Sequence, residues 1–264
     1  MNLNLVRASF ATEFLKLRRS KVTWATLAAF SIAPLAIALF MWIVREPGRA
    51  AQLGLLGTKA NLSGLEATWP SYVSMLTLVV GVGGMLLLAF IVAYVFGREY
   101  AEGTAKNLLV LPIARHWFVL AKLIVAAVWW FALVSAILAE TFAIGFALGL
   151  PGYSAALAAT TVRDVALVAG AAFLLAPPIA WITVLGQGYM PPIGFALATG
   201  ALGDVFTHTG WGAWFPWAIV PMFVGAVGER QAAIAPGSIA VVALTFLLGI
   251  GATIAQLRWA DNAQ

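Results

Sequence analysis

The charged residues between Phe96 and Lys122 form the only sizeable charged island between long apolar runs. Glu99, Glu102 and Lys106 are spaced i, i+3 and i+7, so a helix would present all three on one face, with Glu102 and Lys106 as a favourable i, i+4 pair. Pro112 limits such a helix to about three turns. A short charged helix of this kind is suited to docking, and the alternative is a solvated loop whose charges only set topology.

Other motifs for chemistry are missing from the sequence. It holds no GxxxxGK[ST] phosphate loop, no HExxH and no GxSxG, and it has no cysteine. Asp204 and His208 could face each other on one helical turn, but without a nearby nucleophile a polar helix end is the simpler interpretation. We expect no catalytic residue, cofactor site or metal site in this chain.

Composition indicates an integral membrane protein. Of the 264 residues, 62% are hydrophobic and only 9% are charged, and the mean hydropathy is +0.96, values that a water-soluble domain would not sustain. The apolar runs take up most of the length, so we expect one membrane domain over residues 1–264. The net charge of +5 is placed around apolar runs, which argues against nucleic-acid binding.

Residues 1–21 predict an amphipathic helix on the inner leaflet, bound to membrane lipids through its basic end. The apolar positions recur at helical spacing and are Leu3, Val6, Phe10, Phe14 and Leu17. The charged positions mostly occupy other faces and are Arg7, Glu13, Lys16, Arg18 and Arg19. An ordinary polar N-terminus is the alternative.

Six membrane spans follow from the apolar runs, which gives an all-α membrane fold. The expected spans are about 22–44, 71–96, 117–148, 164–185, 192–205 and 236–257. Pro177 and Pro178 predict a bend in the fourth span, and residues 151–161 are expected to form a loop. The fifth span is too short to cross comfortably as a straight helix.

Residues 210–228 are rich in tryptophan and proline. Trp favours the headgroup level and Pro interrupts helices, so this segment is expected to be interfacial or re-entrant, with a seventh span as the alternative. The residues proposed for it are Trp214, Pro216, Trp217 and Pro221. Glu140, an acid well inside an apolar run, either lines a translocation path or sits at the outer headgroup level.

Basic residues fix the expected orientation. With six spans, ten Lys and Arg fall on the side of the N- and C-termini and five on the other side. Cytoplasmic segments carry the excess of cations. We therefore expect both termini in the cytoplasm of a cell in whose inner or plasma membrane the protein lies, with residues 97–116 as a cytoplasmic segment.

An ordered set of residues between the second and third spans resembles the signature of the ABC-2 type transport permeases, the membrane subunits of ABC exporters. The set is Glu99, Tyr100, Gly103, Thr104, Lys106, Leu109, Pro112, Arg115 and Lys122. The short amphipathic N-terminus and the six spans also match that family. The resemblance implies that this chain forms a translocation path and has no ATPase activity of its own.

The resemblance also implies partners. Two cytoplasmic ABC ATPase subunits would bind ATP and Mg, and a second permease copy or a related permease would complete the path. Coupling to the ATPases would use Arg98, Glu99, Glu102, Gly103, Thr104, Lys106, Leu109, Pro112 and Arg115. The N-terminal helix, with Phe10, Glu13, Phe14, Lys16 and Arg18, would brace the ATPase.

The expected cargo is hydrophobic or amphipathic, such as a drug, a peptide or a lipid-like molecule. Two alternatives from other classes are a membrane-embedded lipid-modifying enzyme, with Glu140, Asp204 and His208 as its candidates, and a non-transporting immunity or scaffold protein.

Overall fold

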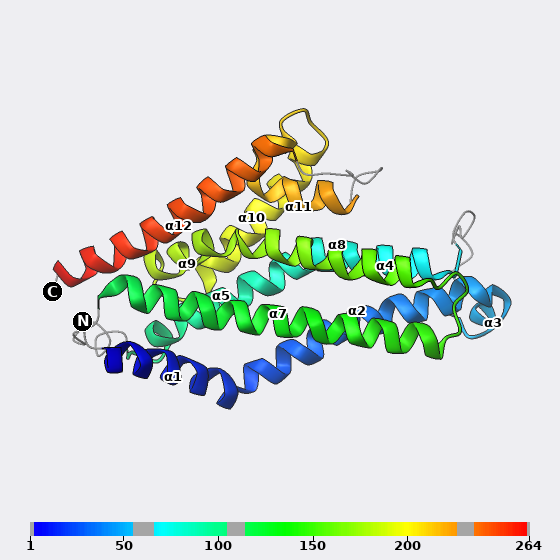
Figure 1. The fold of residues 1–264 in the computed structure, drawn as a ribbon, viewed down its shortest axis with the longest axis horizontal. Helices are drawn as coiled ribbons and strands as arrows, with labels where there is room; N and C mark the ends of the chain where they lie inside the picture. Colours follow the sequence, from blue (N-terminus) through cyan, green and yellow to red (C-terminus); the bar gives the residue numbers. More distant parts are fainter. Residues whose placement is uncertain (1–2, 55–65, 105–113, 226–234, 263–264) are drawn as a thin grey trace.

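A computed structural model describes residues 3–54, 66–104, 114–225 and 235–262. These ranges are helical, with short turns between the helices, and contain no strand (Figure 1). Within these described ranges, five helical segments are long and apolar enough to cross a membrane: Lys21–Arg45, Trp69–Ala101, Arg115–Ala147, Ala155–Leu185 and Pro236–Trp259. The chain is therefore a multi-pass, all-helical membrane protein.

The N-terminal helix α1 (Leu3–Arg19) meets the first span α2 (Lys21–Arg45) at a sharp elbow (Figure 1). Ser20 forms this elbow, because its backbone is extended and its hydroxyl accepts a hydrogen bond from the Val22 amide at 3.1 Å. Such an N-cap starts a new helix in a new direction. A short helix, α3 (Pro47–Gln52), follows α2.

The next two spans form the centre of the bundle. One is continuous through α4 (Trp69–Leu78), the π-helical turn η1 (Val79–Gly83) and α5 (Gly84–Ala101), and the other is α7 (Arg115–Ala147). They approach closely where Gly145 packs on the Trp69 ring, since a Cβ at Gly145 would lie 2.5 Å from that ring. Small residues allow this kind of contact between membrane helices.

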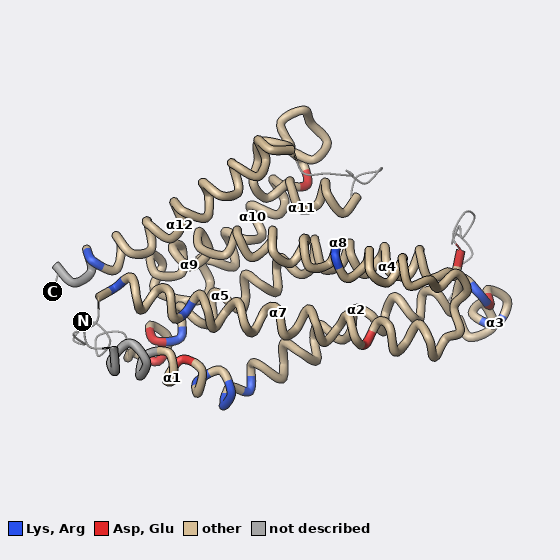
Figure 2. The backbone as a smooth tube through the Cα atoms, viewed as in Figure 1, with Lys and Arg blue, Asp and Glu red and all other residues tan. Residues whose placement is uncertain are grey.

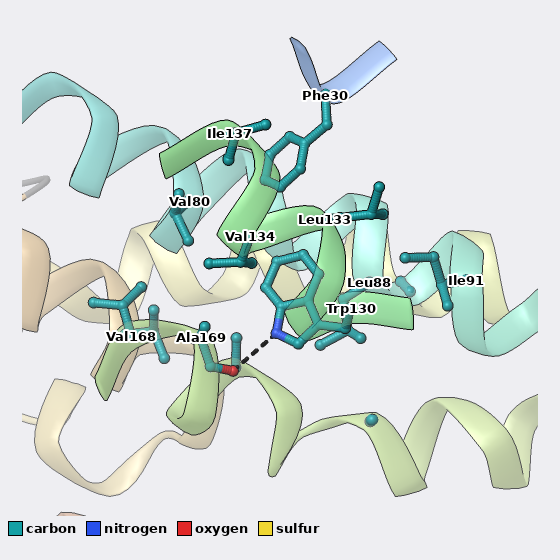
Figure 3. Packing of buried hydrophobic residues seen from close by; sticks show 14 of the residues in the cluster. Phe30, Val80, Leu88, Ile91, Trp130, Leu133, Val134, Ile137, Val168 and Ala169 are labelled. Carbon is teal, nitrogen blue, oxygen red and sulfur yellow. Dashed lines mark hydrogen bonds between the residues drawn. The ribbon is translucent and has the colours of Figure 1, made fainter. Parts of the chain in front are cut away.

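Trp130 of α7 is fully buried in the main apolar cluster (Figure 3). Its indole N–H donates to the carbonyl oxygen of Ala169 at 3.0 Å, which ties α7 to α8 (Ala155–Phe173). The ring also stacks on Phe30 of α2 at a centroid distance of 5.9 Å. One side chain thus joins three spans.

The fourth span begins earlier than the sequence predicted. We expected a loop over 151–161 and a helix from 164, but α8 starts at Ala155, because Ser154 caps it by accepting a hydrogen bond from the Leu157 amide at 3.1 Å. The expected bend is present: α8 ends at Phe173 and α9 (Ala176–Leu185) starts with Pro177 and Pro178 in its first turn. Arg163 and Asp164 therefore lie inside a helix.

The predicted fifth span is the helix α10 (Met190–Thr207), which is not among the five segments that meet the length and hydropathy criteria for a span. Both termini lie at the same end of the molecule, and α10 carries the chain away from that end before α12 (Pro236–Asn262) returns to it (Figure 1). Lys and Arg gather mostly at this end (Figure 2). We call it the basic end.

The described part of 210–228 is a turn followed by the 3-10 helix η2 (Gly212–Trp214) and the helix α11 (Pro216–Val224). Phe215 stacks on Phe206 of α10 at 4.6 Å, and Trp217 packs edge-on against Phe195 at 5.4 Å. With about 1.5 Å of rise per residue, α11 covers less than half of a bilayer core about 30 Å thick. It does not form a seventh span within the described residues.

The packing around Trp130 yields a prediction for stability. Trp130→Ala should lower the free energy of unfolding by about 3–5 kcal/mol, because it leaves a cavity in the core and removes the hydrogen bond between α7 and the Ala169 carbonyl. Trp259→Ala is the matched control, since Trp259 is 73% exposed. Thermal unfolding of both variants in detergent measures the difference, and equal melting temperatures would contradict the role given to Trp130.

Candidate coupling site

Four charged side chains close a ring at the basic end. Lys122 Nζ lies 2.8 Å from both carboxylate oxygens of Glu99 and 3.4 Å from Glu13 Oε2. Lys16 Nζ lies 2.7 Å from Glu13 Oε1 and 2.9 Å from Glu99 Oε1. Each charge therefore has two neighbours of opposite sign. We call Glu13, Lys16, Glu99 and Lys122 the charge ring.

Three helices position the charge ring. Glu13 and Lys16 stand one turn apart on α1, so they share a face, and Glu99 and Lys122 lie near the end of α5 and the start of α7. The Ser20 and Tyr94 hydroxyls are 2.9 Å apart and add a second link between the elbow and α5. The helix α1 is thus fastened to the bundle by its polar face, while Phe14 is 44% exposed on another face.

Three of the four members of the charge ring are buried. Lys122 is 1% exposed, and Glu13 and Glu99 are also buried. Lys122 further donates to the Val95 carbonyl and lies over the rings of Phe96 and Phe118. Two acids and two bases balance each other, which is the condition under which buried charges are tolerated.

Lys16 sits at the edge of the charge ring. Burial disfavours its charged form, but the carboxylates of Glu99 and Glu13 outweigh that effect and raise the pKa of Lys16 above its ordinary value. Lys16 therefore stays protonated at neutral pH and keeps both carboxylates paired.

The predicted single helix bearing Glu99, Glu102 and Lys106 is wrong, because α5 ends at Ala101. Gly103 has a φ of +68°, and the Thr104 amide donates back to the Glu99 carbonyl at 2.8 Å, which is a glycine-terminated helix end. Glu99 is buried as a member of the charge ring. Lys106, Leu109 and Pro112 lie outside the described residues.

The end of α5 also carries a partly exposed ion pair, formed by Arg98 and Glu102. Arg98 Nε donates to Glu102 Oε1 at 2.8 Å, and the Glu102 side chain is 52% exposed. The predicted Glu102–Lys106 pair stays a prediction, because Lys106 lies outside the described residues. Arg115, the last residue of the predicted coupling set, is the first residue of α7. The α5 flank of segment 105–113 thus carries the partly exposed Arg98–Glu102 pair, and the charge ring lies further inward on both flanks.

Comparisons with known proteins agree with this architecture. The model of the ABC-2 family transporter protein matches residues 9–203, which include the charge ring and most of α1 and α10. This chain belongs to the ABC-2 transporter family. It is thus a permease subunit of an ABC transporter, and the family resemblance seen in the sequence is confirmed.

The sequence is also similar to that of a curated relative. The bacitracin transport permease protein BCRB of Bacillus licheniformis is 31% identical over 179 residues, which cover 67% of this chain and 85% of the relative. No solved structure gives a significant match. Membership of the family implies partnership with an ABC ATPase.

The other predicted site residues of this permease are spread over the fold. Glu140 of α7 accepts a hydrogen bond from Ser31 of α2 at 2.8 Å, so it joins two spans. Asp204 and His208 are exposed at the far end of α10, where they do not meet Glu140. Trp214 is exposed, while Pro216, Trp217 and Pro221 are partly buried against the bundle.

Two features were missed by sequence reasoning. The link from Glu13 to Lys122 spans 109 residues and left no local pattern. Asp164 was taken as the first residue of a span, but it is buried within α8 and accepts hydrogen bonds from Arg163 at 3.0 and 3.1 Å. The capping signal of Ser154 would have revealed it.

The charge ring predicts an asymmetric response to mutation. Lys122→Met should cost about 3–5 kcal/mol of stability because it leaves Glu99 short of a buried partner. Adding Glu99→Gln should restore a large part of that loss, because the Glu13–Lys16 pair survives. Arg98→Gln, which removes only the partly exposed ion pair, should cost less than about 1 kcal/mol.

Thermal unfolding of the three purified variants tests this order. The assignment fails if the double variant is less stable than Lys122→Met, or if Arg98→Gln is as damaging as Lys122→Met.

Proposed function

We propose that this permease is the membrane subunit of an ABC exporter whose basic end faces the cytoplasm and receives force from the ATPase. The observation that carries the proposal is the charge ring, which holds α1, α5 and α7 together on both sides of segment 105–113. A push on that segment would reach three helices at once, since a buried ionic contact resists separation.

The distribution of cations supports this orientation. Among the described residues, the basic end carries Lys16, Arg18, Arg19, Lys21, Arg98, Arg115, Lys122 and Arg258, whereas only Arg45, Arg49 and Arg163 lie toward the other end. The excess fits the rule that cytoplasmic segments are positive. Both termini would then be cytoplasmic.

The path of the chain supports a span count of six. An odd number of crossings would separate the termini, but both lie at the basic end (Figure 1). The helix α10, about 27 Å long at 1.5 Å per residue, is the candidate for the remaining crossing. We assign α11 to a re-entrant or interfacial element, supported by its short length and by the exposure of Trp211 and Trp214.

The partner arrangement is proposed from the family. Two ATPase subunits would bind ATP and Mg, and a second copy of this permease, or a related one, would face the first across the path. The coupling surface would comprise Arg98, Glu102 and segment 105–113, with Glu99 acting behind it through the charge ring. The exposed charges would set the register of docking.

The cargo is proposed to be hydrophobic or amphipathic. The relative is named for bacitracin transport, and the spans offer few charged groups to a solute: only 9% of the chain is charged. We also propose that Glu140 lines the translocation path of this cargo.

Charge reversal of the exposed pair tests the coupling proposal. Glu102→Lys should reduce permease-stimulated ATP turnover of the assembled complex by about fivefold or more, the lower end of typical coupling between sites. Glu46→Lys is the matched control, because Glu46 forms the same kind of exposed pair, with Arg49 at 3.0 Å, at the other end of the bundle.

Both variants should unfold at the wild-type temperature, because both side chains are exposed. ATP turnover is measured with the purified complex in lipid. Equal turnover in Glu102→Lys and Glu46→Lys would contradict docking at the basic end.

A further inference from the structure

A cavity of about 210 Å³ lies between α5, α9, α10 and α11. Its lining side chains are apolar, and none of them carries a charge. They include Val82, Leu86, Leu175, Gly200, Trp217 and Pro221. Glu140 is not among the lining residues, so this cavity is separate from the acid that the sequence suggested for a path.

Three breaks in regular helix meet at the cavity. Val82 belongs to the π-helical turn η1, Leu175 stands at the junction of α8 and α9, and Pro221 lies inside α11. Each break disturbs backbone hydrogen bonding, which is costly in a membrane. Single π-turns and broken membrane helices recur at functional sites. Their convergence indicates a binding site and not a packing defect.

The volume and the opening limit what can bind. The cavity holds about seven groups of the size of a water molecule, at about 30 Å³ each, and it falls below the roughly 300–1,000 Å³ of sites for drug-sized ligands. Leu86 and Leu197 line it and are 46% and 55% exposed, so it opens on an apolar side of the bundle. Such an opening admits molecules from the lipid phase.

We propose that this cavity binds a single hydrocarbon tail of an amphiphile that enters from the bilayer. The absence of charge in the lining excludes a headgroup, and the size admits a stretch of one chain. Binding of the tail does not require an ATPase. Only the further step, that a tailed amphiphile is the cargo, rests on the function proposed above.

Gly200→Leu blocks the cavity with little strain elsewhere. A Cβ at Gly200 would meet no atom within 4 Å, so the leucine side chain has open space to fill. Gly194→Leu is the matched control, because Gly194 lies on the same helix, has the same open surroundings and does not line the cavity. Both changes raise helix propensity.

The probe is palmitoyl lysophosphatidylglycerol with a diazirine in mid-chain, added to the permease alone in phosphatidylcholine nanodiscs. After irradiation, mass spectrometry should find the label on peptides that contain residues 82–88 and 197–201. The yield should fall about tenfold in Gly200→Leu and stay unchanged in Gly194→Leu. Labelling of α2 and α12 as strong as that of the cavity peptides would contradict the binding site. Equal labelling yields in the two variants would also contradict it.

A second arm separates the two sources of a tail. Diazirine-labelled phosphatidylglycerol with two chains should label the same peptides if bilayer lipid occupies the cavity, and weaker labelling than with the lysolipid indicates a single-tailed cargo. If the cavity peptides of the wild-type permease are labelled but Glu102→Lys leaves ATP turnover unchanged, the coupling proposal is refuted and the binding site stands.

If the cavity peptides are not labelled but Glu102→Lys lowers ATP turnover as expected, the binding site is refuted and the coupling proposal stands.

Discussion

The electrostatic closure of the charge ring is the interaction on which the arrangement of the basic end depends. Taking Glu99 or Lys122 alone into this dry environment would cost several kcal/mol, so neither residue can be understood without the other. The two residues also fix α1, because Glu13 and Lys16 complete their pairing. A helix that composition alone would assign to the membrane surface is thereby made part of the bundle.

The charge ring anchors the two helix ends that flank the segment between α5 and α7. The helix end at Gly103 and the helix start at Arg115 stand close to the charge ring in sequence, and a displacement of either end is opposed by contacts to the other and to α1. Tyr94 of α5 also stacks on Tyr189 at a centroid distance of 6.2 Å, and a Cβ at Gly97 would lie 3.0 Å from the same ring. The turn between α9 and α10 therefore contacts the same helix that receives the proposed force.

Much of the membrane architecture could be predicted because the thickness of the bilayer sets the minimum length of an apolar run that spans it. The first, second, third and last spans appear near their expected positions, and the bend at Pro177 is present. The start of α8 was missed because its alanine-rich first turns are neither clearly apolar nor clearly polar. The end of α5 was misjudged although Gly103 carried the signal, since the charge spacing was weighted above it. The partners of Glu99 were not predictable, because contacts across 83 and 23 residues leave no periodic trace.

The sequence separation within the charge ring also determines the order in which the protein assembles during synthesis. Glu13 and Lys16 leave the ribosome long before Lys122, whose helix must be inserted before the four charges can meet. During synthesis α1 has only its apolar residues, such as Phe14, and its basic residues to hold it at the bilayer, and the charge ring closes only after the third span is in place. Packing of the N-terminal helix on the bundle through the charge ring is thus a late step of assembly, which must wait until the third span is inserted.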